Sequence, residues 1–291
     1  MFSLSGNARE FSGEKIMGIK IGKYGFSFVC TGFTVLFLFV FIASAAEEES
    51  RRGMIKIRQK SYTYGTVVMD QFTKDKEIRP VVFRHWVHRS KHTCRLCHTD
   101  LEFEMKAGFT EVHEEDNRAG RFCGACHNGV EAFGWKQNIT DNNKKPEEYC
   151  ARCHSPFEVG EDPAAKNKFY QMAKTLPKAR YGNRVDWTQA HDEGKIKPKD
   201  TLPGYSPSVE RLKEVHEIKL TSKRKGFPNI IFSHKKHSVW NGCDMCHPFV
   251  FALKTGKTKF DMQDIFEGRF CGACHGNVAF PTQECQRCHT D

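Results

Sequence analysis

The chain contains six copies of one short pattern, in which two cysteines are separated by two residues and followed directly by a histidine. Thiols three positions apart lie on one side of a helical turn, so both can bond to the same edge of a flat ligand. The histidine then brings an imidazole to a metal at the centre of that ligand. The pattern therefore predicts six covalently attached haems of the c type, each with its iron bound by the motif histidine. The motifs are Cys94–Cys97–His98, Cys123–Cys126–His127, Cys150–Cys153–His154, Cys243–Cys246–His247, Cys271–Cys274–His275 and Cys285–Cys288–His289.

Other uses of paired cysteines fit this pattern poorly. Structural zinc can be bound by two cysteine pairs, and a single pair can act as a redox dithiol, but neither needs a histidine after every second cysteine. The motifs use every cysteine of the 13 in the chain except Cys30, which lies in an apolar N-terminal segment. No cysteine pair is left to form a disulfide framework.

The second axial ligand decides what each haem can do, because six-coordinate iron has no open position for a substrate. Eight of the 14 histidines lie outside the motifs, which is enough for a second ligand at all six irons. His92 and His191 fit a simple surface role. The remaining six candidates are His85, His88, His113, His216, His234 and His237. No catalytic residue is predicted.

The motifs are organised as an internal duplication. The sequence GRFCGACH occurs at 120–127 and again at 268–275, and residues 81–98 align with residues 230–247. Each copy has Phe-x-His-x-x-His followed by three motifs. We therefore expect an N-terminal signal or anchor, two trihaem domains, and a proline-rich linker with a short helix that starts at Asp162-Pro163. The expected boundaries are 1–45, 61–156 for trihaem domain I, 157–208 for the linker and 209–291 for trihaem domain II.

Few regular elements are expected to position the motifs. Residues 66–68 and 81–83 predict a β-hairpin before the first motif, and residues 218–220 and 230–232 predict its counterpart. A short helix opening at Pro146 is expected to carry the third motif. Only 39% of the residues are hydrophobic, so side chains alone supply little core. We expect a mostly irregular fold with short α-helices, small β-hairpins and a core made of haem.

The order Phe-x-His-x-x-His and three motifs resembles the trihaem cytochrome c7 branch of the cytochrome c3 family, known from metal- and sulfur-respiring bacteria. The resemblance covers both repeats and implies bis-histidine ligation in a haem-cored periplasmic protein. It implies that His85 and His234 bind the first haem of their repeats, and that His88 and His237 bind the second.

The ligand of the third haem departs from this family pattern. Family members have a histidine just before the second motif, but the four residues before Cys123 and Cys271 include none. His113 is the candidate in repeat one, and its aligned residue in repeat two is Asp261. Met262, next to Asp261, is therefore favoured in repeat two over His216.

The N-terminal segment predicts export. Basic residues precede an apolar run at 26–43, and Ala43-Ser44-Ala45 fits a cleavage site, although the run is also long enough for a retained anchor. The formal net charge of +10 balances the propionates of six haems rather than indicating nucleic acid.

We therefore expect an electron carrier of anaerobic respiration in the periplasm or at the outer face of the inner membrane. Its expected partners are a membrane quinol-oxidising complex and other cytochromes. The alternatives are a multihaem reductase with one open haem and a filament-forming cytochrome. The chain has no Cys-x-x-Cys-Lys motif, which multihaem nitrite reductases use at the active haem.

Overall fold

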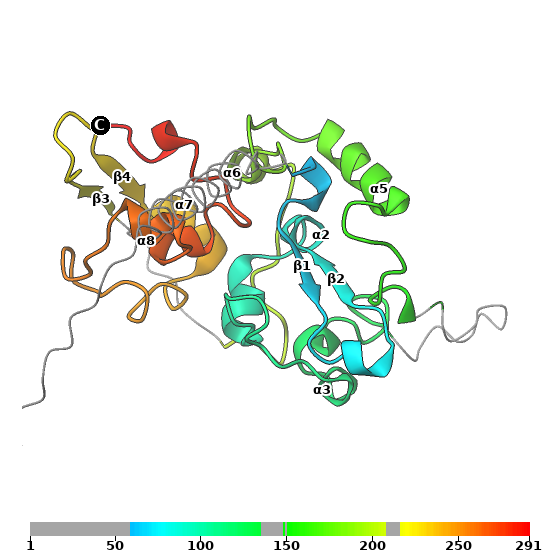
Figure 1. The fold of residues 1–291 in the computed structure, drawn as a ribbon. Coiled ribbons are helices and arrows are strands. Elements are labelled where there is room, and N and C mark those ends of the chain that lie inside the picture. Colours follow the sequence, from blue (N-terminus) through cyan, green and yellow to red (C-terminus); the bar gives the residue numbers. More distant parts are fainter. Residues whose placement is uncertain (1–58, 135–147, 149, 208–215) are drawn as a thin grey trace, which may run out of the picture. The chain divides into compact units, whose positions relative to one another are not determined.

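The computed structural model describes residues 59–134, 148, 150–207 and 216–291, which lie in one compact unit (Figure 1). The expected signal or anchor, Cys30 and the expected helix start at Pro146 lie outside the described residues. Within these ranges, no helix combines the length and apolar character needed to cross a membrane.

Two β-hairpins open the two repeats, and both predicted hairpins are confirmed. Each is an antiparallel two-stranded sheet, with Val67 opposite Phe83 in the first and Ile218 opposite Phe232 in the second. Each hairpin runs directly into a helix that carries the two histidines of Phe-x-His-x-x-His (Figure 1). The elements are β1 (Thr66–Met69), β2 (Val81–Arg84), α2 (His85–Arg89), β3 (Glu217–Leu220), β4 (Ile230–Ser233) and α7 (His234–Asn241).

The later motifs follow in matched short helices. The second motif of each repeat begins in a 3₁₀ turn that a five-residue helix precedes. The third motif returns to the hairpin, because His154 forms an isolated β-bridge with Val81 and His289 forms one with Ile230. The predicted fold class, short helices and small hairpins in a largely irregular chain, is confirmed. These helices are α3 (Glu114–Arg118) with the turn Phe122–Ala125, and α8 (Met262–Phe266) with the turn Phe270–Ala273.

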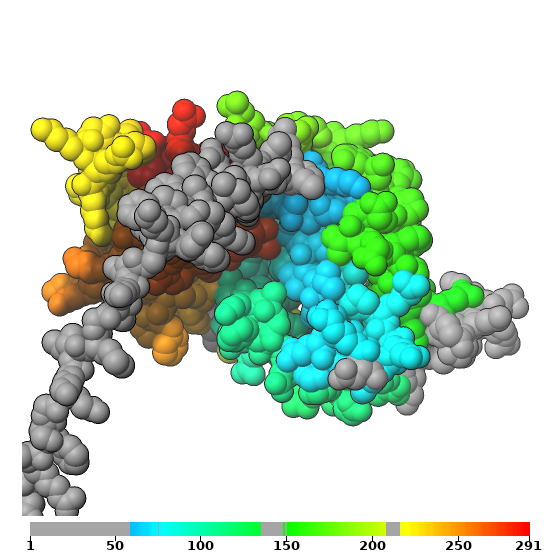
Figure 2. Space-filling view, in the orientation of Figure 1, coloured from blue at the N-terminus to red at the C-terminus, as the bar shows by residue number. Residues whose placement is uncertain are grey.

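The segment between the repeats builds most of the larger side-chain core. The predicted helix is confirmed as α5 (Pro163–Lys174), whose first turn is capped by Asp162 through a hydrogen bond from the Ala165 amide (3.0 Å). A second helix, α6 (Trp187–Asp192), follows. Figure 2 shows the green α5 segment packed against the blue start of repeat one. The buried residues of this core are Tyr62, Trp86, Phe169, Ala173, Leu176, Val185, Trp187, Ala190, Ile196 and Trp240.

Residues 157–208, which were expected to form a linker, contribute to this core. Phe169 and Ala173, on one face of α5, are buried, and α6 adds Trp187 and Ala190. Trp86 of repeat one and Trp240 of repeat two join the same cluster. The connecting segment therefore packs against both repeats and does more than space them.

Candidate haem sites

We number the six candidate haem sites 1 to 6 in the order of their motifs, so that sites 1–3 belong to repeat one and sites 4–6 to repeat two. Four motif histidines face a second histidine from the Phe-x-His-x-x-His segment of the same repeat. The ring centres are 6.4 Å apart at site 1 (His85 and His98), 6.2 Å at site 2 (His88 and His127), 6.4 Å at site 4 (His234 and His247) and 6.1 Å at site 5 (His237 and His275).

These separations fit two imidazoles that bind one iron from opposite sides. A metal–nitrogen bond of about 2.0 Å and about 1.1 Å from that nitrogen to the ring centre give about 6.2 Å between ring centres. Rings in direct contact would lie closer. The four pairs therefore have the spacing of axial ligands, and the motif cysteines beside them supply the thiols for covalent attachment.

Every histidine of these pairs is oriented by a backbone carbonyl, and so are the motif histidines of sites 3 and 6. When Nδ1 donates its proton to a carbonyl, Nε2 is left unprotonated and free to bind a metal. The acceptors are Gly65 for His85 (2.6 Å), Arg84 for His88 (3.4 Å), Phe103 for His98 (2.8 Å), Phe133 for His127 (3.1 Å), Arg79 for His154 (2.6 Å), His216 for His234 (2.7 Å), Ser233 for His237 (2.8 Å), Phe251 for His247 (2.6 Å), Phe280 for His275 (3.3 Å) and Pro228 for His289 (2.8 Å).

Burial keeps the paired imidazoles of sites 1, 2 and 5 neutral. Desolvation lowers the pKa of His85, His88 and His275 to about 4 each. It also lowers the pKa of His98, His127 and His237. A histidine must be unprotonated at the nitrogen that binds a metal, so these imidazoles are ready to ligate at neutral pH.

The phenylalanine of Phe-x-His-x-x-His contacts both histidines of its segment. The ring of Phe83 lies 4.4 Å from that of His88 at an interplanar angle of 25°, and meets the ring of His85 edge-on at 4.9 Å. Phe232 repeats this with His237 at 4.3 Å and His234 at 4.9 Å. The aromatic ring therefore restricts the rotation of both imidazoles, which explains why it belongs to the repeated pattern.

The identity of GRFCGACH in the two repeats also has a packing reason. The motif backbone passes so close to the preceding helix that a Cβ on Gly124 would lie 1.9 Å from the Asn117 carbonyl oxygen. A Cβ on Gly272 would lie 2.0 Å from the Ile265 oxygen. Ion pairs join the same two parts, Arg121 with Asp116 in repeat one and Arg269 with Asp264 (2.6 Å) in repeat two. Sites 2 and 5 are thus built on a tight helix–motif junction.

Sites 3 and 6 differ from the other four. Within the described residues, no imidazole faces His154 or His289 at the spacing of the four pairs. His113 lies just before α3 with its ring 4.2 Å from that of Phe72. Met262 is the first residue of α8 and is 39% exposed.

The hairpin loops connect these ligand candidates to sites 3 and 6. In repeat one, a single loop carries Phe72, which contacts His113, and Arg79, whose carbonyl accepts the His154 hydrogen bond. In repeat two, the equivalent loop carries Lys223, which donates to the Phe260 carbonyl (3.0 Å), and Pro228, which accepts from His289. The side chain of His216 is exposed, and its carbonyl orients His234.

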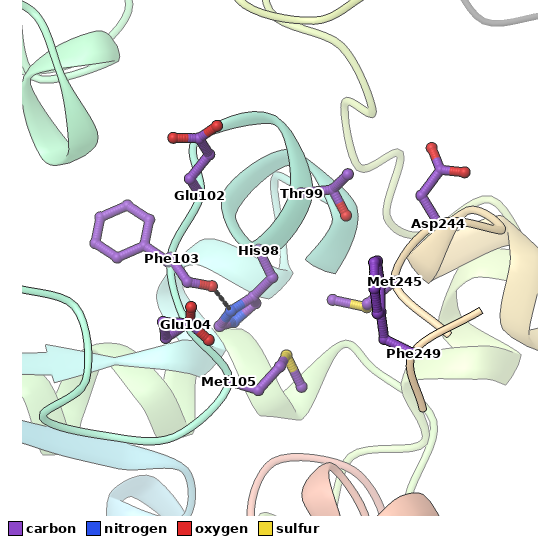
Figure 3. A pocket seen from close by; sticks show the side chains of 9 residues that line it. All are labelled: His98, Thr99, Glu102, Phe103, Glu104, Met105, Asp244, Met245 and Phe249. Atoms are coloured by element: carbon purple, nitrogen blue, oxygen red, sulfur yellow. Dashed lines mark hydrogen bonds between the residues drawn. The ribbon is translucent and has the colours of Figure 1, made fainter. Parts of the chain in front are cut away.

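A cavity of about 360 Å³ lies at site 1 (Figure 3). His98, Phe103 and Met105 line it from repeat one, and Figure 3 shows the hydrogen bond from His98 to the Phe103 carbonyl. Met245 and Phe249, from the motif loop of site 4, line the cavity from repeat two. Its volume is within the range of small-molecule sites, and its lining belongs to site 1 and its neighbour.

Paired axial imidazoles, attachment cysteines and short elements that hold them define a multihaem c-type cytochrome. A model of the family described as cytochrome c7 and related cytochrome c matches residues 81–168 and 230–290, just over half of the chain. The chain belongs to this family. The match falls on both repeats, which agrees with two c7-like modules.

The chain is also similar to solved multihaem cytochromes. A c7-type three-heme cytochrome domain is 37% identical, over 26% of this chain and 95% of that one, with a TM-score of 0.24. The C-terminal hexaheme fragment of GSU1996 is 25% identical, over 78% of this chain and 98% of that one, with a TM-score of 0.24. The dodecaheme cytochrome c GSU1996 is 25% identical, over 78% of this chain and 74% of that one, with a TM-score of 0.24. No curated protein matches the chain.

Sequence reasoning missed the groups that orient the ligands. Their acceptors are backbone carbonyls, which leave no mark on residue identity. The contacts of Phe83 and Phe232 had a signal, because both residues stand at a fixed place in the repeated pattern. No sequence signal indicated that Trp86, Trp187 and Trp240 pack into one core, since these residues lie far apart in the sequence.

Proposed function

We propose that the protein is a hexahaem electron carrier that passes electrons between a membrane quinol-oxidising complex and other cytochromes. The observation that carries this proposal is the set of four facing histidine pairs at sites 1, 2, 4 and 5. Bound haem supplies iron that gains and loses one electron at a time. Two imidazoles on one iron leave no position for a substrate, so such a site transfers electrons without binding a reactant.

The protein's own residues keep these sites rigid. The backbone carbonyls hold each imidazole in one tautomer, and Phe83 and Phe232 restrict ring rotation. Rigid ligands change little in position when the charge of the iron changes, which favours rapid electron exchange. The cavity at site 1, shared with the motif loop of site 4, supports an electron path that continues from one repeat to the other.

His113 and Met262 are the proposed second ligands at sites 3 and 6. The support is positional, because each lies where a helix start meets the hairpin loop that orients the site's motif histidine. A thioether in place of an imidazole raises the reduction potential of a haem. Site 6 is therefore proposed as a high-potential end of the path.

Sites 3 and 6 also give a specific reason to retain the reductase alternative. No facing imidazole among the described residues completes them, and a five-coordinate iron can bind a small oxyanion or another reactant. Absence of both proposed ligands in the holoprotein would favour this second function.

The proposed location is the periplasm or the outer face of the inner membrane, in a pathway of anaerobic respiration. Support comes from the basic and apolar N-terminal sequence and from the family's c-type haem attachment. The many Lys and Arg side chains are proposed to balance the negative charge of the haem propionates. Charged groups of both signs then lie on the surface, and we expect salt to weaken the binding of redox partners.

Spectroscopy of the holoprotein tests the proposal. The denatured mass should exceed the polypeptide mass by six haems, and the oxidised protein should show low-spin haem alone. His237→Ala should create one high-spin haem that binds cyanide, because it removes one member of a facing pair. His191→Ala is the control, because the ring of His191 lies against Trp240 and, among the described residues, pairs with no motif histidine, and this variant should leave the spectrum unchanged. High-spin haem in the unmodified protein would contradict the carrier function and support a reductase.

A further inference from the structure

Arg89 joins the two repeats and the segment between them. It follows His88 at the end of α2, and its Nη1 donates a hydrogen bond to the Val278 carbonyl of repeat two (2.9 Å). The carbon at the centre of its guanidinium lies 5.3 Å from the ring centre of Trp187 and 5.0 Å from that of Trp240. Both distances are within the range of cation–π interaction.

The charge of Arg89 has no counterion from the described residues. No carboxylate among them forms an ion pair with it, and its buried Nε has no hydrogen-bond partner. Asp186, whose charge acts on Arg89, is itself paired with Arg287 (3.4 Å). Guanidinium stays protonated in proteins even where burial lowers its pKa. No carboxylate side chain among the described residues therefore neutralises this cation between two tryptophans.

The surroundings of Arg89 are sites 1 and 5. Val278 follows the site 5 ligand His275 by three residues. On the other side, a Cβ placed on Gly65, whose carbonyl orients the site 1 ligand His85, would lie 3.4 Å from Val278. Cys94 of the site 1 motif packs against the same buried cluster that contains Trp187 and Trp240, so the cation lies beside site 1 as well as beside site 5.

The duplication provides an internal comparison. Residues 81–98 align with 230–247, so Ser238 stands where repeat one has Arg89. The ligand geometry is otherwise closely matched, with ring separations of 6.4 Å at both site 1 and site 4. Site 1 and site 4 therefore have the same ligands, and only site 1 lies beside the buried cation.

We propose that Arg89 is a positioning and charge-setting residue that raises the reduction potentials of sites 1 and 5 above those of the other bis-histidine sites, 2 and 4. A fixed positive charge favours the reduced iron, which carries one positive charge less. A unit charge about 10 Å away at an effective dielectric constant of about 20 changes such an equilibrium roughly tenfold. The inference rests on the proposed function only in requiring bis-histidine haem at sites 1 and 5.

The test is a redox titration of the holoprotein, with the haems assigned by NMR of their methyl groups. In Arg89→Gln, the ratio of reduced to oxidised haem at a fixed potential should fall roughly tenfold at sites 1 and 5. Arg89→Lys should retain most of the wild-type ratio. Lys235→Gln removes an exposed cation from the matching helix α7 and is the control, with little change expected.

Three results would overturn the proposal: a titration of Arg89→Gln that superimposes on the wild type, an equal change at all six sites, or the same loss in Arg89→Lys as in Arg89→Gln. The last result would assign Arg89 to packing alone. If Arg89→Gln does not mature, Ser238→Arg is the second variant and should raise a potential in repeat two; no rise there would also count against the proposal. Haem content and spin state, measured on the same samples, test the electron-carrier function separately.

Discussion

Replacing Gly124 or Gly272 by alanine should destabilise the protein strongly, because the added methyl group meets backbone. Its carbon would lie 1.9 Å from the Asn117 oxygen or 2.0 Å from the Ile265 oxygen, so the helix and the motif must separate by about 1 Å. Overpacking of this kind costs about 1–3 kcal/mol. The shift also weakens the hydrogen bond from Gly120 to Asn117 (3.2 Å) or from Gly268 to Ile265 (3.1 Å), which adds about 1 kcal/mol.

The expected loss is therefore about 2–4 kcal/mol, or a fall of about 5–15 °C in Tm for a chain of this size. Thermal and denaturant unfolding of holoprotein measure it. The control is Gly256→Ala, where φ is +78° and nothing lies within 4 Å of the added carbon. The Gly256→Ala variant should lose only about 1 kcal/mol of stability, because alanine is less favourable than glycine in a left-handed backbone conformation. If Gly124→Ala and Gly272→Ala lose no more than the control, the close approach of helix and motif is not a determinant of stability.

Three further predictions follow from the ligands and the junction. First, burial raises the pKa of Tyr64 to about 12, against about 10 in an unfolded chain, so its contribution is complete below pH 10 and lost as the pH rises to 12. Over that interval, wild type should lose about 1–2 kcal/mol more stability in denaturant unfolding than Tyr64→Phe, and parallel curves would refute this. Second, the ligand planes meet at 7° and 26° at sites 1 and 4 but at 65° and 63° at sites 2 and 5. EPR should therefore resolve two classes of low-spin haem, and one uniform class would contradict the ligand geometry. Third, near-infrared magnetic circular dichroism should show one His–Met haem that Met262→Ala removes and His216→Ala leaves intact, and a bis-histidine spectrum in wild type would exclude Met262.

The sequence predicted those parts of the fold that short-range patterns determine. Both hairpins follow from clusters of β-branched residues, and α5 follows from Asp162-Pro163 and the apolar spacing after it. The Phe-x-His-x-x-His segments pointed to the four histidines that the structure brings opposite motif histidines.

What the sequence did not predict depends on contacts between distant segments. Trp187 and Trp240 enclose Arg89 only in the folded chain, and the apolar spacing of α5 gave no sign that its core would include residues of both repeats. Backbone acceptors such as the Gly65 carbonyl can belong to any residue type. The ligands of sites 3 and 6 depend on side chains outside the repeated pattern, which is why His113 and Met262 stay predictions.

The junction at Val278 also has a consequence for how the two repeats differ as binding partners. Its contact is heterologous, because the segment after the site 5 motif binds the hairpin side of the other repeat. The Tyr64 hydroxyl donates to the Ala279 carbonyl (2.6 Å), and Arg89 donates to the Val278 carbonyl. Head-to-tail contacts propagate without limit when every unit carries both surfaces.

The surface that receives this segment includes Trp86 and Arg89 of repeat one. Repeat two has Lys235 and Ser238 at the aligned positions. Repeat one also has the segment that corresponds to the one after the site 5 motif. Its Val130, the counterpart of Val278, is 83% exposed. The two residues on α7 therefore make this contact one-directional: repeat one receives the segment after the site 5 motif, and the matching helix of repeat two lacks the tryptophan and arginine that receive it.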